Sequence, residues 1–164
     1  MLTVDANVWI AANDRGDTQM ERSRDFLAAA TRQQETIFLP SFAQVEIACA
    51  LARRRRSPEI GQQLANQIMA LSHIVAVPLD SALVTQSVQT GTRLLLRSAD
   101  ALYATVAAMH SAQLVSWDAE LIPVALAGMI VAIAFNPHFS LIVTFGLCLL
   151  SSLSLGMGIS HFIV

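Results

Sequence analysis

The chain has 164 residues, ten of them arginine and none lysine, against twelve acidic residues, for a formal net charge of −2. This balance excludes a globally basic nucleic-acid-binding protein, so any contact with nucleic acid has to come from a local patch. All acidic and basic residues lie between Asp5 and Glu120, whereas residues 123–164 carry none. We therefore expect one α/β-sized domain over residues 1–122, followed by an uncharged tail over 123–164.

Short apolar runs alternate with amphipathic segments along the first 122 residues. Apolar runs that predict strands lie at 1–4, 36–39, 74–78 and 113–116. Segments that predict helices lie at 18–32, 41–55, 57–72, 81–90 and 98–110. Ser41, Ser57 and Ser98 are the expected N-caps, and Pro58 suits the first helical position. The alternation predicts an α/β fold with a parallel sheet of about four strands covered by helices.

The sequence also predicts which helix face is buried and in what state the cysteines are. The helix over 41–55 is expected to bury one face, formed by Val45, Ala48, Cys49 and Ala52. The two cysteines, Cys49 and Cys148, have no metal-ligand spacing and predict buried thiols in a reducing compartment. The chain does not start with a basic segment followed by an apolar one, so we expect a cytoplasmic domain. For Trp9 and Trp117, core packing is a simpler explanation than base stacking.

Four carboxylates fall where the expected strands end or the expected helices run. Asp5 ends the first strand and Asp118 follows the fourth. Glu46 lies in the helix over 41–55, and Asp100 lies in the first turn of the helix over 98–110. The carboxyl ends of parallel strands and the N-termini of the following helices open on one side of the sheet, so all four can converge.

Clustered carboxylates repel one another and raise one another's pKa unless a cation neutralises them. Oxygen ligands without nearby His or Cys favour Mg²⁺ or Mn²⁺, which can activate water for phosphodiester hydrolysis. Asn7 and Ser116, each two residues from a carboxylate, are expected to hydrogen-bond and orient it. Taken alone, each acidic residue is more simply explained as a helix cap, a surface charge or an ion-pair partner, and Asp100 suits a helix N-terminus. Sequence chemistry therefore leaves both interpretations open.

Four segments resemble the acidic motifs of PIN domains, in the family's order. They are LTVDANVWI around Asp5, PSFAQVEI around Glu46, SADALYATVA around Asp100 and LVSWDAEL around Asp118. The resemblance covers residues 1–122 and is closest to the VapC-like toxins of toxin–antitoxin pairs. It implies a Mg²⁺- or Mn²⁺-dependent endoribonuclease that uses these four carboxylates as catalytic metal ligands. It also implies an RNA substrate, a small antitoxin that covers the site, and a homodimer.

Other α/β families with an acidic residue after the first strand fit less well. Receiver domains and haloacid-dehalogenase-like phosphatases use a lysine near the phosphoryl group, and this chain has none. A dinucleotide-binding fold needs a glycine-rich turn after the first strand, where this chain has Ala6-Asn-Val-Trp. A different class of function stays open, namely a catalytically inactive PIN-like binding module tethered to a membrane.

Arginines provide the candidate RNA contacts. Arg53 and Arg54 belong to a run of four arginines that closes the helix over 41–55. They could bind phosphates or an acidic antitoxin segment, although basic residues also simply favour a helix C-terminus. Arg93 and Arg97 precede Asp100 and are better placed to reach a bound phosphate.

The uncharged tail departs from the family pattern, which continues with one more strand and a short helix. Residues 140–164 are long enough to span a bilayer, residues 121–135 are marginal, and Asn136-Pro137 suits a turn between them. We expect a membrane helical hairpin rather than a helix for oligomerisation in water. The segment PVALAGMIVAIAF at 123–135 resembles part of the membrane region of seven-transmembrane HD phosphohydrolases. One hypothesis is therefore a chimeric gene product, natural or from gene assembly.

Overall fold

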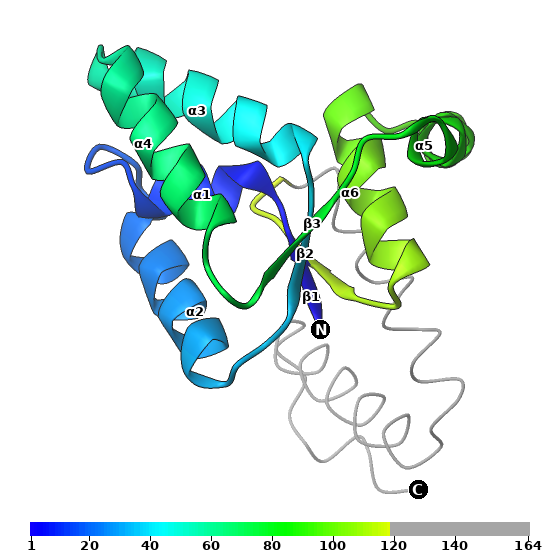
Figure 1. Cartoon of the computed structure of the whole chain (residues 1–164), viewed down its shortest axis with the longest axis horizontal. Coiled ribbons are helices and arrows are strands. Elements are labelled where there is room, and N and C mark those ends of the chain that lie inside the picture. Colours follow the sequence, from blue (N-terminus) through cyan, green and yellow to red (C-terminus); the bar gives the residue numbers. More distant parts are fainter. Residues whose placement is uncertain (119–164) are drawn as a thin grey trace, which may run out of the picture. The chain divides into compact units, whose positions relative to one another are not determined.

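The computed structural model describes residues 1–118, which form a parallel four-stranded sheet between helices (Figure 1). The strand order is β3-β2-β1-β4, with β1 (Leu2–Val4), β2 (Ile37–Pro40), β3 (Ile74–Val77) and β4 (Gln113–Val115). The helices are α1 (Ala6–Ala12), α2 (Met20–Arg32), α3 (Phe42–Arg55), α4 (Pro58–Met69), α5 (Ser81–Leu94) and α6 (Ser98–Met109). The expected α/β fold with a parallel sheet is confirmed.

Strand β1 lies inside the sheet, because it pairs with β2 on one side and with β4 on the other. Figure 1 shows α1, α2 and α4 on one side of the sheet and α5 and α6 on the other. The core between these layers contains Val4, Ile37, Leu39, Ile47 and Leu51, all fully buried. Because the strands are parallel, the residues that follow β1 and β4 come out at the same edge of the sheet.

Helix α1 was not expected from the sequence. It begins directly after β1, and Asp5 is its N-cap residue, accepting a hydrogen bond from the backbone N–H of Asn7 at 3.3 Å. Its seven residues are mostly apolar and buried, so its pattern continues that of the strand before it. Periodicity alone does not separate a short buried helix from an extended run.

The expected N-caps are confirmed in part. Ser41 is the N-cap residue of α3, but its backbone angles are helical and its hydroxyl accepts the N–H of Leu79 at 3.0 Å rather than an N–H of the helix. Arg97, not Ser98, is the N-cap residue of α6. Ser57 caps α4 as predicted, accepting from the N–H of Ile60 at 3.3 Å.

The expected buried face of α3 is only partly right, because Ala48 and Ala52 are partly buried but Val45 and Cys49 are exposed. The helix buries Ala43, Ile47 and Leu51, whereas Val45 is 55% exposed. Cys49 is exposed as well, so it is not the buried thiol that the sequence predicted. Because positions 43, 47 and 51 face the core, Glu46, which directly precedes Ile47, lies at the border of the core and is half-buried.

Helices α3 and α4 approach closely at Gly61. A Cβ atom on this residue would lie 2.5 Å from the backbone oxygen of Ala48 and 2.7 Å from the Cβ of Ala52. Glycine is therefore required for this helix pair to pack as it does. The close packing fixes α3, which carries Glu46.

The tail prediction lies outside the described residues. Within residues 1–118, no helix is long and apolar enough to cross a membrane. The proposed hairpin over 123–164, the domain boundary at residue 122 and the resemblance of residues 123–135 to a membrane region all stay predictions, as does everything about Cys148.

Candidate active site

Asp5 is the centre of a hydrogen-bond network at the carboxyl edge of the sheet. It is buried, and one of its oxygens accepts the Ser116 hydroxyl at 2.6 Å while the other accepts the Asn7 N–H at 3.3 Å. Burial raises the pKa of Asp5, and the charge of Asp118 adds to this, against the lowering effect of the two hydrogen bonds. The two hydrogen bonds thus fix the orientation of the Asp5 carboxylate, while burial and the charge of Asp118 disfavour its ionised form.

Ser116 and Asn7 tie the end of β4 to the start of α1. The Asn7 amide donates to the Ser116 hydroxyl at 2.9 Å, and the backbone N–H of Trp117 donates to the Asn7 carbonyl oxygen at 3.2 Å. The backbone N–H of Asp118 also donates to the Ser116 hydroxyl at 2.9 Å. The two residues predicted to orient a carboxylate therefore both contact the Asp5 and Asp118 region, and they join it into one network.

Glu46 faces the same region from α3. Its carboxylate accepts the Tyr103 hydroxyl at 2.7 Å. Burial raises the pKa of Glu46, the hydrogen bond from Tyr103 lowers it, and the charges of Asp5 and Asp100 raise it further. Tyr103 is fully buried on α6, and it was not among the site residues predicted from the sequence. An aromatic residue three positions after an acidic one on a helix was the available signal.

Electrostatic coupling links all four predicted carboxylates. Glu46 is within the influence of Asp5 and Asp100, and Asp5 is within that of Asp118. Asp100 is buried in the first turn of α6. Asp118 is partly exposed, and its Oδ2 lies 3.7 Å from a guanidinium nitrogen of Arg97. The fold therefore brings the four residues into one region from β1, α3, α6 and the segment after β4.

The donor set suits a hard divalent cation. It consists of carboxylate oxygens with hydroxyl and amide neighbours, and two of the carboxylates have pKa values raised by burial and like charge. A bound cation would relieve that repulsion. Over residues 1–118, however, no three acidic, His or Cys side chains stand together as a preformed metal-binding group. The residues fit the ion chemically, without forming a closed cage.

The predicted RNA-binding arginines lie in different surroundings. Arg54 pairs with Asp14 at 2.7 Å and Asp17 at 2.9 Å, which holds the loop after α1 against the end of α3. Arg53 and Arg93 are exposed. Arg97, as described above, contacts Asp118. Of these four, Arg97 is the one that the structure brings to the carboxylates.

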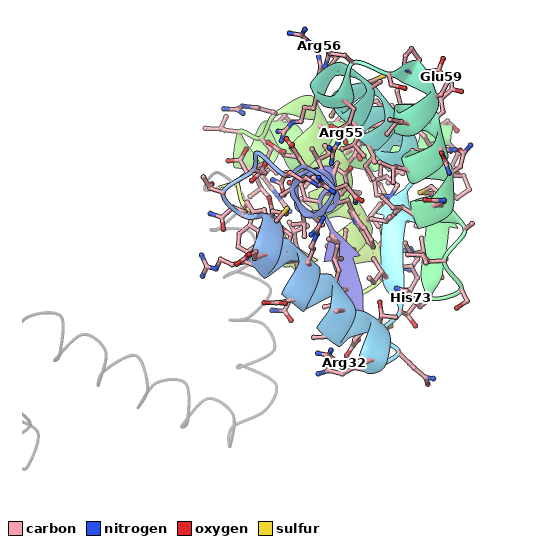
Figure 2. All side chains as sticks on the ribbon, turned by 90° about the vertical axis from the view of Figure 1, so that its left-hand side faces the viewer. Arg32, Arg55, Arg56, Glu59 and His73 are labelled. Atoms are coloured by element: carbon pink, nitrogen blue, oxygen red, sulfur yellow. The ribbon has the colours of Figure 1, made fainter. Side chains whose placement is uncertain are left out.

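The end of the arginine run lies away from the amino ends of the strands. Figure 2 shows Arg55 and Arg56 at the opposite end of the domain from Arg32 and His73, which precede β2 and β3. The Arg55 guanidinium donates to the backbone oxygen of Asn13. Arg54 and Arg55 of the run thus bind the loop between α1 and α2 to the end of α3.

The two tryptophans differ in how far they are buried. Trp9 is 4% exposed and packs in the core, as expected. Trp117 is 38% exposed, so the core-packing prediction is wrong for this residue. Its position after a three-residue strand at the side of the sheet keeps it out of the core.

Comparisons with known proteins identify the family and the fold. A family model described as PIN domain matches residues 2–126. Among solved structures, VapC20 of Mycobacterium tuberculosis, a sarcin–ricin-loop-cleaving toxin, superposes with a TM-score of 0.62 at 17% identity, over 73% of this chain and 91% of that chain. VapBC2 from Rickettsia felis, solved with a DNA fragment from its promoter, gives 0.54 at 16% identity, over 75% and 92%. No curated protein matches this chain. At these identities the superpositions show a shared fold.

Proposed function

Because the chain belongs to the PIN domain family, we propose that it is a metal-dependent endoribonuclease and the toxin of a VapBC-type pair. The family and the VapC-like fold indicate a nuclease; the metal and the RNA substrate are the proposal's own additions. The observation that carries it is the coupling of Asp5, Glu46, Asp100 and Asp118 at the carboxyl edge of the sheet.

These four carboxylates would hold Mg²⁺ or Mn²⁺, which when bound supplies an activated water and stabilises the leaving oxygen. The chain's own residues prepare the site for this. Ser116 and Asn7 fix the rotamer of Asp5 through the hydrogen bonds described above, and Tyr103 fixes Glu46. Burial of Asp5 and Asp100 excludes water from one side of the carboxylates. Arg97 is placed to attract a phosphate.

A cleavage assay on structured RNA with Mg²⁺ tests the proposal. We expect Asp5→Asn and Asp100→Asn to abolish cleavage, and Ser116→Ala to reduce it about 10- to 100-fold, because it removes an orienting hydrogen bond. Asp25→Asn, at an exposed position of α2, is the matched control and should keep full activity. Cleavage that survives both substitutions at Asp5 and Asp100 would contradict the metal-ligand assignment.

Metal binding is measured separately, by titration calorimetry of the unsubstituted chain with Mn²⁺. If the ion binds but RNA is not cut, the domain is a binding module rather than an enzyme. If neither binding nor cleavage occurs, the proposal is wrong as a whole.

The antitoxin and the homodimer belong to the same proposal. Asp118 and Arg97 place a negative and a positive charge at the surface, where a partner segment could bind. Arg53 and Arg93 are exposed and could contact acidic residues of that partner. Sequencing of the neighbouring genes should reveal a small antitoxin candidate, and its co-expression with this chain should give a complex that no longer cleaves RNA. Light scattering on the chain alone tests for the dimer, and a monomer at all concentrations would contradict it.

Membrane attachment through residues 123–164 is proposed from the absence of charge in that segment alone. Together with the PIN domain it would give a nuclease held at the cytoplasmic face of a membrane. The test is described in the Discussion.

A further inference from the structure

Trp117 joins the candidate site through its backbone and leaves its ring exposed. Its backbone N–H donates to the side-chain oxygen of Asn7 at 3.2 Å, and its chain neighbours are Ser116 and Asp118. The residue is 38% exposed, whereas Trp9 is 4% exposed. A partly exposed tryptophan thus directly precedes Asp118 in the chain, and its backbone belongs to the network of the candidate site.

Helix α2 holds this ring in place. The indole Nε1–H donates to the hydroxyl of Ser23 at 2.9 Å, and Ser23 is itself fully buried. The guanidinium carbon of the neighbouring residue, Arg22, lies 5.6 Å from the centroid of the ring. An exposed ring that is fixed by a buried partner is already ordered for contact, so a ligand that stacks on it loses little side-chain entropy.

We propose that the indole of Trp117 is a stacking platform for one unpaired base of the RNA substrate, and that Arg22 contacts the phosphate beside that base. The inference rests on the proposed ribonuclease function and adds a binding subsite to it. Every base has a π-face, so stacking on an aromatic ring provides affinity without strict sequence choice.

Charge and position both favour a nucleotide as the occupant. Among residues 1–118, no carboxylate lies within ion-pair distance of Arg22, so its charge is available to a phosphate. Asp118 follows Trp117 directly. The proposed platform residue is therefore joined by one peptide bond to a proposed metal ligand.

A purely structural role for Trp117 is the competing explanation. In that case the Nε1–Ser23 bond would only fasten the end of β4 to α2. The two explanations differ in one respect: a fastener affects all RNAs equally, whereas a stacking platform is sensitive to whether the base is present.

The test measures binding of a short fluorescein-labelled single-stranded RNA to the full chain by anisotropy, in EDTA so that no cleavage is needed. A series of RNAs carries one abasic nucleotide at each position in turn. We expect one abasic position to weaken binding to the unsubstituted chain about five- to hundredfold. Trp117→Ala should weaken binding of the intact RNA by a similar factor, and the abasic change should then have no additional effect.

Trp117→Phe retains a ring without the Nε1 donor and should keep most of the sensitivity to the abasic position. Arg22→Lys keeps the charge and should bind RNA nearly as tightly as the unsubstituted chain, whereas Arg22→Ala should bind less tightly at low salt. If the losses from Trp117→Ala and from the abasic nucleotide simply add, the stacking proposal is wrong although RNA binding stands.

A second measurement needs no change at Trp117. In Trp9→Phe, Trp117 is the only tryptophan, and stacking of a base should quench its fluorescence in step with the anisotropy change. RNA that binds without quenching overturns the platform alone. A chain that binds no RNA under these metal-free conditions overturns the platform, whereas the proposed function is overturned only if the cleavage assay with Mg²⁺ fails as well.

Discussion

Tyr103 and Glu46 show how the core supports the candidate site. Burial and the neighbouring Glu46 carboxylate raise the pKa of Tyr103 far above its ordinary value, so the phenol stays protonated and remains a donor. Its hydrogen bond opposes the rise that burial causes in the pKa of Glu46. A fully buried aromatic residue on α6 therefore controls a half-buried charge on α3.

Tyr103→Phe removes this donor and keeps the ring. We expect the pKa of Glu46 to rise, which moves the pH profile of RNA cleavage to higher pH. The free energy of unfolding should fall by about 1 kcal/mol, the usual net contribution of one hydrogen bond. Urea unfolding and pH-dependent cleavage rates measure the two effects.

Glu46→Gln in both backgrounds completes a double-mutant cycle for this contact. The readout is the pH dependence of urea unfolding, because Glu46→Gln removes a proposed metal ligand, and the effect of Tyr103→Phe on it should vanish when the titrating group is absent. A shift that persists in the Glu46→Gln background would assign the profile to another residue.

Asp5 and Glu46 also predict how stability depends on pH and metal. Folding raises both pKa values above the ordinary 3.8 and 4.5, so the folded state takes up protons more readily than the unfolded chain. Without metal, the free energy of unfolding should therefore increase as the pH falls from neutral through the raised values. Mg²⁺ or Mn²⁺ should stabilise the protein at neutral pH, and this effect should fade in the same pH range.

Thermal unfolding between pH 4.5 and 7.5, with and without metal, measures this behaviour. Asp5→Asn should be more stable than the unsubstituted chain at neutral pH without metal, and should gain less from metal. The pKa of Asp14 is lowered, chiefly by its hydrogen bond from Arg54, so its contribution is lost only below this range. Stability that falls steadily from pH 7.5 to 4.5 would contradict the prediction.

At the scale of elements, Gly61 sets the distance between α3 and α4. Gly61→Ala would place a methyl group against the backbone of Ala48, and one of the two helices must shift. We expect a loss of about 1–3 kcal/mol in the free energy of unfolding. Gly16→Ala is the control, because its Cβ would meet only the Asp14 carboxylate at 3.7 Å. Equal stability of the two variants would show that the helices separate without cost.

Elements with a clear period or an abrupt change in composition were predictable. The four strands and α2 to α6 were each expected within a few residues. Helix α1 was not, because its apolar residues directly follow those of β1. The buried face of α3 was misassigned, because its many alanines and small apolar residues allow more than one stripe.

The candidate site was predictable for a different reason. Asp5, Glu46, Asp100 and Asp118 stand at strand ends and helix positions that an α/β sheet brings together. Their supporting residues depend on side-chain packing across elements: Tyr103 contacts Glu46 from another helix, and Trp117 contacts Ser23 across 94 positions of sequence. Periodicity carries no information about such pairs.

For the molecule as a whole, the uncharged segment gives a direct prediction. The full chain should float with liposomes in a density gradient, whereas a chain ending after Leu126, which keeps all residues of the PIN match, should stay at the bottom. The physical reason is that forty-two residues without charge favour a hydrocarbon environment over water. A full chain that stays at the bottom with the truncated one would contradict membrane attachment.

The hydrogen bond between Asp5 and Ser116 joins residues that are 111 positions apart, and this separation has a consequence for timing. A ribosome synthesises Asp5 near the start of translation, but Ser116, Trp117 and Asp118 are added only after all of the helices described above. Until β4 has left the ribosome and paired with β1, the nascent chain contains an unsupported Asp5 and no complete site. A site that needs residues from both ends of the domain can therefore form only late in synthesis, once β4 has paired with β1.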